Sequence, residues 1–187
     1  MNTTKNRILD IAEDLVQEVG LNAMSYQHIS DAVGIRKASV HHHFPRKENL
    51  VDALLERCHD SYGDKYRIIV EGEGHAPVKL RRLAAVFADG LEKRQLCLVG
   101  TISSDLNTLQ AGTCSVLETT IQDTVEIFAD AFRQGRREKS LAFNSGPDET
   151  AYAFYSFLLG AQIAARACGG APSFHAATEA MISSWEK

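Results

Sequence analysis

Apolar residues recur at helical spacing along almost the whole chain, and this periodicity is the feature that most limits its fold. The first 20 residues carry one apolar stripe at i, i+3, i+4, i+7 and i+8: Ile8, Ile11, Ala12, Leu15 and Val16. Similar stripes run from Leu80 to Leu91, from Leu117 to Phe132, and from Ala177 to Trp185. No run alternates apolar and polar residues between Asn-Gly or Asp-Gly turns. The sequence therefore predicts an all-α protein of about nine helices.

Caps and breaks divide these helices. Thr3 or Thr4 is suited to cap the first helix, and Gly20 is suited to end it. The third long stripe is expected to end near Gly135. Helices are short in the first 50 residues and longer afterwards. We therefore expect a boundary between residues 48 and 49, with short helices before it and longer helices after it.

Composition excludes several classes of protein. The 187 residues are 44% hydrophobic and 24% charged, with a net charge of -4, as in an ordinary soluble domain. The four cysteines are widely spaced, without a C-x-x-C pair, so neither a disulfide scaffold nor a zinc site is expected. No signal peptide and no membrane span are recognisable. We expect a cytoplasmic protein with reduced thiols and no membrane partner.

Residues 25–44 read as two short helices around a tight turn. Ser25 is suited to cap a helix over Tyr26–Val33, whose Ile29, Ala32 and Val33 are expected to face inward. Gly34 then occupies a position that favours positive φ. A second helix over about Lys37–His43 is stopped by Pro45. This is the pattern of a helix-turn-helix, and the small Ala32 and Ala38 favour close crossing of its helices.

Charge is concentrated on the second of these helices. Residues 1–48 hold six basic and six acidic side chains, a net charge of zero, but residues 32–47 contain no acid. That acid-free window holds Arg36, Lys37, Arg46 and Lys47, with three histidines. Such a local basic surface favours binding to phosphates. Consecutive helical residues point about 100° apart, so His41, His42 and His43 cannot share one metal ion, and no metal is expected.

The stretch from Ile8 to Leu55 resembles the DNA-binding domain of the tetracycline-repressor-like (TetR) transcriptional regulators. The matching features are V-G-I at 33–35 and, above all, K-A-S-V-H-H-H-F-P-R-K-E-N-L at 37–50. The rest of the chain resembles the family in its layout of longer helices, with the last two suited to dimerisation. The resemblance implies a helix-turn-helix DNA-binding domain over residues 1–48 and a helical ligand-binding and dimerisation domain over 49–187. It also implies a homodimeric repressor that binds a palindromic double-stranded DNA operator and is released by a small-molecule inducer.

The resemblance also implies roles for individual residues. The positions that match DNA-contacting positions of the family are Ser25, Tyr26, Gln27, Arg36, Lys37, Ala38, Ser39, His41, His43 and Lys47. Three positions depart from the family pattern. His41 stands where tyrosine is usual, and Arg36 and Arg46 stand where small capping residues are common, so the operator sequence is not transferable.

The family's middle helices enclose a small-molecule cavity, which implies a set of ligand-binding candidates. These are Cys58, Tyr62, Tyr66, Phe87 and Tyr155. Some members sense electrophiles or oxidants through thiols, so Cys97 and Cys114 are the alternative trigger in a thiol-sensing repressor. Ordinary core packing is the competing interpretation for every aromatic residue, and a small buried hydrophobe is the competing interpretation for every cysteine.

Residues 151–167 are apolar on nearly every side of a helix. A helix of that kind must be covered all round, and in so small a protein a second subunit is the best cover. We therefore expect a homodimer through residues 150–187, with small residues such as Gly160 allowing close helix approach.

Other function classes are less well supported. The sequence has no G-x-S-x-G, P-loop, dinucleotide-binding glycine or H-E-x-x-H motif, so no enzyme and no cofactor are expected. A helical adaptor that kept this fold without binding DNA stays open. A gel-shift assay on the promoter beside its own gene separates these classes. The inducer, the regulated genes and the choice between repression and activation are not encoded in any recognisable motif.

Overall fold

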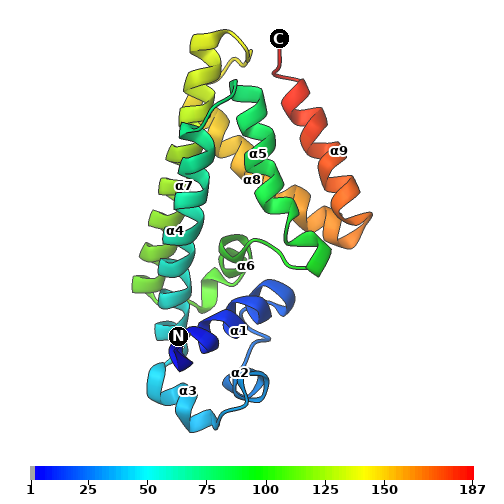
Figure 1. The fold of residues 1–187 in the computed structure, drawn as a ribbon. Helices are drawn as coiled ribbons and strands as arrows, with labels where there is room; N and C mark the ends of the chain where they lie inside the picture. Colours follow the sequence, from blue (N-terminus) through cyan, green and yellow to red (C-terminus); the bar gives the residue numbers. More distant parts are fainter. Residues whose placement is uncertain (1–2) are drawn as a thin grey trace. The chain divides into compact units, whose positions relative to one another are not determined.

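Helices make up all the regular structure of the computed structural model, which describes residues 3–187 (Figure 1). Within that range the α-helices are α1 Thr4–Val19, α2 Tyr26–Val33, α3 Lys37–His43, α4 Lys47–Glu71, α5 Ala76–Ala88, α6 Leu98–Ser104, α7 Ala111–Glu138, α8 Pro147–Ala167 and α9 Gly170–Ser183. Two short 3₁₀ helices, η1 Leu91–Lys93 and η2 Leu106–Thr108, lie between them. The predicted all-α fold of about nine helices is confirmed.

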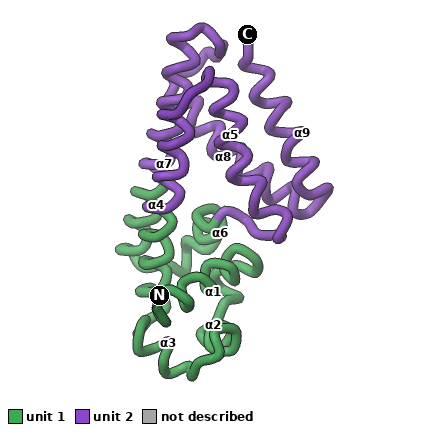
Figure 2. The backbone as a smooth tube through the Cα atoms, viewed as in Figure 1, with its two compact units in different colours: residues 1–59, 98–120 green, residues 60–97, 121–187 purple. Residues whose placement is uncertain are grey.

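The chain divides into two compact units that interleave along the sequence (Figure 2). Unit 1 contains residues 1–59 and 98–120, and unit 2 contains residues 60–97 and 121–187. Helices α4 and α7 contribute to both units. The predicted boundary between residues 48 and 49 falls in the first turn of α4, and the assignment of separate functions to 1–48 and 49–187 stays a prediction.

Unit 1 is built around the inner faces of α1, α2 and the first half of α4. Its fully buried side chains include Ile8, Ile29, Val40, Leu50 and Leu54. The expectation that Ala32 faces inward was wrong. The buried stripe of α2 runs through Tyr26, Ile29, Ser30 and Val33 at i, i+3, i+4 and i+7, which leaves Ala32 exposed. Ala38 is also exposed, so it is not part of a close helix crossing.

Helix ends in unit 1 follow the predicted capping residues. The Thr3 side chain accepts a hydrogen bond from the Asn6 N–H, and Gly20 ends α1 with φ of 93°. The Ser25 side chain accepts from the His28 N–H at the start of α2. These bonds satisfy donors that a helix N-terminus leaves without an intrahelical partner.

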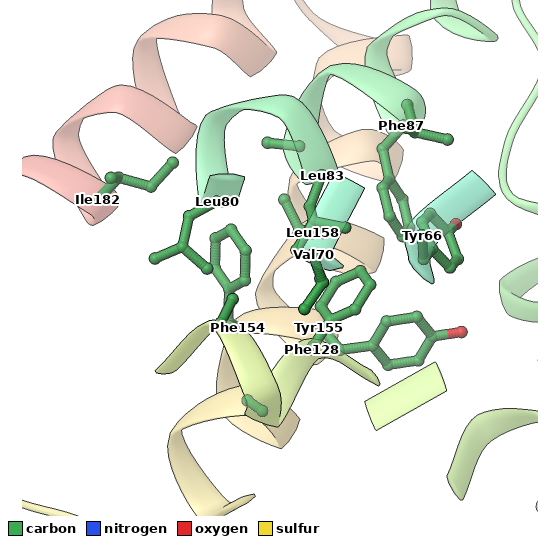
Figure 3. Close-up of a cluster of buried hydrophobic side chains, with 14 of the residues drawn as sticks. Tyr66, Val70, Leu80, Leu83, Phe87, Phe128, Phe154, Tyr155, Leu158 and Ile182 are labelled. Atoms are coloured by element: carbon green, nitrogen blue, oxygen red, sulfur yellow. The ribbon is translucent and has the colours of Figure 1, made fainter. Parts of the chain in front are cut away.

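Unit 2 packs α5, α8 and α9 around an apolar core (Figure 3). Phe128, Phe132, Phe154 and Phe174 are its largest fully buried side chains. Buried polar groups are paired: the Gln162 side chain accepts from the Cys97 N–H at 2.6 Å and donates to the Phe87 carbonyl at 2.6 Å. A paired amide inside a core avoids the cost of an unsatisfied polar group.

Three predicted helix ends in unit 2 differ from the structure. Helix α5 stops at Ala88, and Leu91 is buried from η1 instead. Helix α7 continues past Gly135 to Glu138. A Cβ at Gly135 would lie 2.4 Å from Leu141 Cδ1, so this glycine allows a close approach of the following loop and does not end the helix. Trp185 lies beyond α9, with its ring against Phe132 and Phe154.

None of the helices in residues 3–187 combines the length and the apolar character that a membrane span requires.

Candidate functional site

Helices α2 and α3 and the turn between them form the helix-turn-helix, with the predicted bounds Tyr26–Val33 and Lys37–His43. Gly34 adopts the left-handed conformation, with φ of 75° and ψ of 39°. Its N–H and that of Ile35 both donate to the Ser30 carbonyl, at 2.9 and 3.0 Å. Only a residue without a Cβ adopts this turn conformation at little cost, so the predicted role of Gly34 is confirmed.

Helix α3 turns one side chain inward and leaves its basic side chains accessible. Val40 is buried, whereas Arg36, Lys37, Ala38 and His41 are exposed. Ser39 and His43 are half-buried. Arg36 is the N-cap residue and its side chain makes no capping hydrogen bond, as its replacement of a small cap predicts. The predicted contact residues of α3 thus share an accessible, acid-free helix.

Tyr26 lies under α3 rather than on the surface. Its side chain is only 8% exposed, and its hydroxyl donates to the carbonyls of Phe44 and Arg46, at 2.8 and 2.9 Å, sharing one proton between them. Burial, with a smaller effect of the Glu48 charge, raises the pKa of Tyr26 to about 12. The structure therefore places Tyr26 at the end of α3 as a support of the backbone, and a direct DNA contact by this residue stays a prediction.

Lys47 begins α4 as predicted, but its ammonium group also holds the loop between α1 and α2. Its Nζ donates to the carbonyls of Leu21 at 2.6 Å and Met24 at 3.0 Å. Burial lowers the pKa of Lys47, and the charges of Asp105 and Glu48 oppose that shift. An ammonium group has three donors, so one remains for another acceptor such as a phosphate.

Asp105, which the sequence analysis did not single out, holds the same loop from a distant part of the chain. Its carboxylate accepts from the Asn22 backbone N–H at 3.2 Å and from the Asn22 side-chain amide at 2.8 Å. Asn22 and Asp105 are 83 residues apart in sequence. No local pattern links them, and only the contact of α1 with α6 within unit 1 brings them together.

Three acidic side chains near the helix-turn-helix have partners within unit 1. The Gln27 amide donates to Asp31 at 2.8 Å along α2, so the side chain proposed to reach a base is paired in the free protein. On α1, Asp10 and Glu13 both bind Arg57 of α4. The Arg46 N–H donates to the Asn49 side chain at 3.2 Å, which supplies a cap at the start of α4. Helix α3 itself carries no acidic residue.

Three of the five ligand-binding candidates come together in unit 2. The rings of Tyr66 and Phe87 are stacked with centroids 6.2 Å apart, and Phe87 lies edge-on to Tyr155 at 6.1 Å (Figure 3). Phe128, which was not among the ligand-binding candidates, contacts all three rings at 5.2 to 6.4 Å. Its place on the apolar stripe of α7 predicted burial but not these neighbours. We call Tyr66, Phe87, Phe128 and Tyr155 the aromatic cluster.

The remaining candidates lie beside this cluster or elsewhere. Tyr62 is one turn before Tyr66 on α4, with ring centroids 6.1 Å apart. Cys58 is buried in unit 1, whereas the aromatic cluster lies in unit 2. The two proposed sensor thiols are both half-buried: Cys97 precedes α6, and Cys114 lies in the first turn of α7. Among residues 3–187 no group of three His, Cys, Asp or Glu side chains is arranged to hold a metal.

Comparison with protein families agrees with this geometry. Residues 8–54 match the family model "Bacterial regulatory proteins, tetR family". The chain is 44% identical over 66 residues to the HTH-type transcriptional repressor KstR2 of Rhodococcus jostii, a match covering 35% of this chain and 32% of that protein. It is 27% identical over 172 residues to the HTH-type transcriptional repressor NemR of Escherichia coli, covering 87% and 84%. The chain spans less than half of KstR2 in its alignments to the R. jostii and Mycobacterium tuberculosis proteins.

Solved structures extend the similarity to the whole fold. A transcriptional regulator of the TetR family from Agrobacterium tumefaciens superposes with a TM-score of 0.91 at 24% identity, covering 98% of this chain and 97% of that one. The reduced form of E. coli NemR superposes with a TM-score of 0.82 at 22% identity, covering 99% and 98%. At these identities the likeness establishes the arrangement of helices, and the function has to be argued from the site.

Proposed function

We propose that this chain is a homodimeric transcriptional repressor of the TetR type, because residues 8–54 match the tetR family model and the whole chain shares the fold of a TetR-family regulator. It binds a palindromic DNA operator through α3 and leaves the operator when a small molecule occupies unit 2. Because the chromosome of a bacterium lies in its cytoplasm, we expect this repressor to work there.

The observation that carries this proposal is the exposed, acid-free surface of α3 in a helix-turn-helix with a left-handed glycine turn. A second helix presented in this way enters the major groove, where its side chains reach base edges. Lys37, Ala38, Ser39 and His41 are the proposed base-facing residues. Gln27 on α2 is proposed to reach a base edge. Phosphate contacts are proposed for Ser25, His43 and Lys47, and a phosphate or guanine contact is proposed for Arg36.

The direct test is selection of duplexes from a random library by the full-length protein, followed by a gel-shift assay on the selected duplex. We expect a palindrome whose half-site centres are about one or two helical turns apart. Selection of no duplex at low salt would contradict the DNA-binding function and favour the helical adaptor.

Dimerisation is supported by an uncovered stripe on α8. Small or apolar residues are exposed at i, i+4, i+8 and i+11 of this helix, at Tyr152, Ser156, Gly160 and Ile163. Tyr152 is 59% and Ile163 is 55% exposed, and a Cβ at Gly160 meets nothing within 4 Å. Helices α8 and α9 of two copies packed face to face would cover this stripe as a four-helix bundle.

The aromatic cluster is the proposed receptor for the inducer, which would be a small and largely apolar molecule. Tyr66 belongs both to this cluster and to α4, the helix that begins with Lys47 at the proposed DNA interface. A ligand that displaces Tyr66 would therefore act on a helix that is continuous with the DNA-contacting residues. We propose that α4 tilts between a DNA-binding and a released position. The ligand shifts the equilibrium between these positions only if it binds them with different affinity.

A further inference from the structure

Tyr26 makes two contacts that together connect α2 to the accessible face of α3. Its hydroxyl is bound to the carbonyls of Phe44 and Arg46, at the C-terminal end of α3. Its ring lies edge-to-face against the His41 ring, with centroids 4.7 Å apart and an interplanar angle of 61°. The backbone at Tyr26 is itself fixed, because Ser25 caps α2 immediately before it.

The hydroxyl contacts hold the Tyr26 ring in one orientation. A buried tyrosine whose hydroxyl has backbone acceptors cannot turn its ring without leaving those carbonyls unpaired. The ring is therefore a fixed surface, and an exposed side chain that packs against it loses part of its rotational freedom. His41 is that side chain, since His42 and His43 instead contact each other, with ring centroids 5.4 Å apart.

His41 is the proposed base-reading residue at a position where the TetR family usually has tyrosine. A histidine that is exposed on a helix samples several staggered rotamers. Base readout needs the imidazole nitrogens in a defined place relative to the groove, so restricting His41 before binding favours the bound state. The edge-to-face geometry is one of the preferred arrangements of aromatic rings.

We propose that Tyr26 is a positioning residue that determines sequence preference through His41: it pre-orients the imidazole for the major groove and does not itself contact phosphate. The proposal rests on the proposed DNA-binding function. It replaces the phosphate contact that resemblance to the family implies for Tyr26, because the only polar atom of this side chain is already bound to two carbonyls.

The first measurement uses no DNA. In a ¹³C–¹H spectrum of His-labelled full-length protein, the Tyr26 ring current should displace the imidazole proton signals of His41. The His41→Ala variant identifies those signals. We expect the displacement to remain but to be smaller in Tyr26→Phe, which keeps the ring without the hydroxyl bonds that fix it, and to vanish in Tyr26→Leu. A His41 signal that is the same in wild type and Tyr26→Leu would overturn the proposal.

The second measurement compares binding to the selected duplex and to its single-base variants. His41→Ala should lose about tenfold of its preference at one half-site position. Tyr26→Leu should lose preference at that same position, and the double variant should lose no more than His41→Ala alone. If Tyr26→Leu instead weakens all duplexes equally, or if the two losses add, Tyr26 has only a structural role and the proposal fails.

Tyr26→Phe provides a test that does not depend on the stability of Tyr26→Leu. We expect this variant to keep the slope of log affinity against log salt and to lose less base preference than Tyr26→Leu, because it keeps the ring but not the hydroxyl bonds that fix it. A slope smaller by about 0.9 would mean that the hydroxyl contacts phosphate, which overturns the proposal. If wild type selects no duplex, the DNA-binding function fails, while the spectrum still reports whether Tyr26 orients His41.

Discussion

The side chains of Tyr26 and Lys47 donate hydrogen bonds to backbone carbonyls of other residues in the domain, although resemblance to the family implies that both contact DNA. Both side chains satisfy loop carbonyls that no helix or strand would satisfy. A buried carbonyl without a partner costs more than a hydrogen bond gains, so these pairings stabilise the shape of the free domain. In the free protein these two side chains therefore stabilise the fold, whatever contacts they make to DNA.

The raised pKa of Tyr26 predicts a loss of stability at high pH. In the folded protein this pKa is about 12, above its value of about 10 in an unfolded chain. A group with a raised folded pKa stabilises fully below pH 10, and that contribution is lost as pH rises to 12. We expect about 2–3 kcal/mol of unfolding free energy to be lost in this window. Urea unfolding of wild type and Tyr26→Phe from pH 8 to 12 measures this loss. Equal slopes of unfolding free energy against pH in the two proteins would contradict the assignment to Tyr26.

Lys37 and Lys47 should affect DNA binding in different ways. Lys37→Ala should flatten base preference, by about 1–3 kcal/mol at one position. Lys47→Ala should weaken all duplexes alike, reduce the salt slope by about 0.9, and lower stability because the Leu21 and Met24 carbonyls lose their donor. Lys93→Ala, on η1 in unit 2, is the control that should leave base preference, salt slope and stability unchanged. Fluorescence anisotropy over a salt series measures these effects, and parallel losses in all variants would refute the assignment of roles.

At the scale of helices, local signals located the elements well where a cap or a breaker is present, and less well where packing decides. Both helices of the helix-turn-helix have the predicted bounds, because Ser25, Gly34 and Pro45 act on their immediate neighbours. The predicted end of α7 at Gly135 was wrong, because the glycine at this position makes room for Leu141, which lies outside the helix. A glycine in a helical pattern can therefore end the helix or allow close packing against it, and the sequence alone does not distinguish these two roles.

Substitution of two glycines of α7 distinguishes those explanations. Gly135→Ala brings a Cβ to 2.4 Å from Leu141 Cδ1 and 3.0 Å from the Ala76 Cβ, so we expect destabilisation of about 1–3 kcal/mol from overpacking. Gly112→Ala meets nothing within 4 Å, and should be neutral or stabilise by up to about 1 kcal/mol through helix propensity. Thermal unfolding checks both, and a stable Gly135→Ala variant would show that the loop at Leu141 yields easily.

The receptor proposed in the aromatic cluster and the thiol sensor proposed at Cys97 and Cys114 can be tested separately. A Cys97→Ser, Cys114→Ser variant keeps the backbone bond from residue 97 to Gln162 and all four rings of the cluster. We therefore expect it to be released from DNA by a non-covalent inducer as wild type is. A gel shift with an apolar ligand and with an electrophile makes the comparison. Loss of the ligand response in this variant would contradict the aromatic cluster as receptor.

At the scale of the whole molecule, the uncovered stripe of α8 predicts that the folded chain does not act alone. Gly160→Arg places a charged side chain in the middle of this stripe, and we expect a folded monomer whose operator affinity falls about a hundredfold or more, because two half-sites are no longer bound together. Ser61→Arg, at an exposed position of α4, is the matched control and should stay dimeric. Sedimentation at micromolar concentration measures the oligomeric state of both variants. A dimeric Gly160→Arg protein would mean that the interface lies elsewhere.

The sequence by itself determined the helical class, the position of the helix-turn-helix and the basic, acid-free character of α3. These properties depend on neighbours within a few turns, so periodicity, caps and local charge are sufficient to predict them. Tertiary structure alone decided that Tyr26 lies beneath His41, that Asp105 holds Asn22 from 83 residues away, and that Phe128 completes the aromatic cluster. Such contacts join residues that are distant in sequence, and they form only because packing buries particular helix faces against one another, which no local pattern specifies.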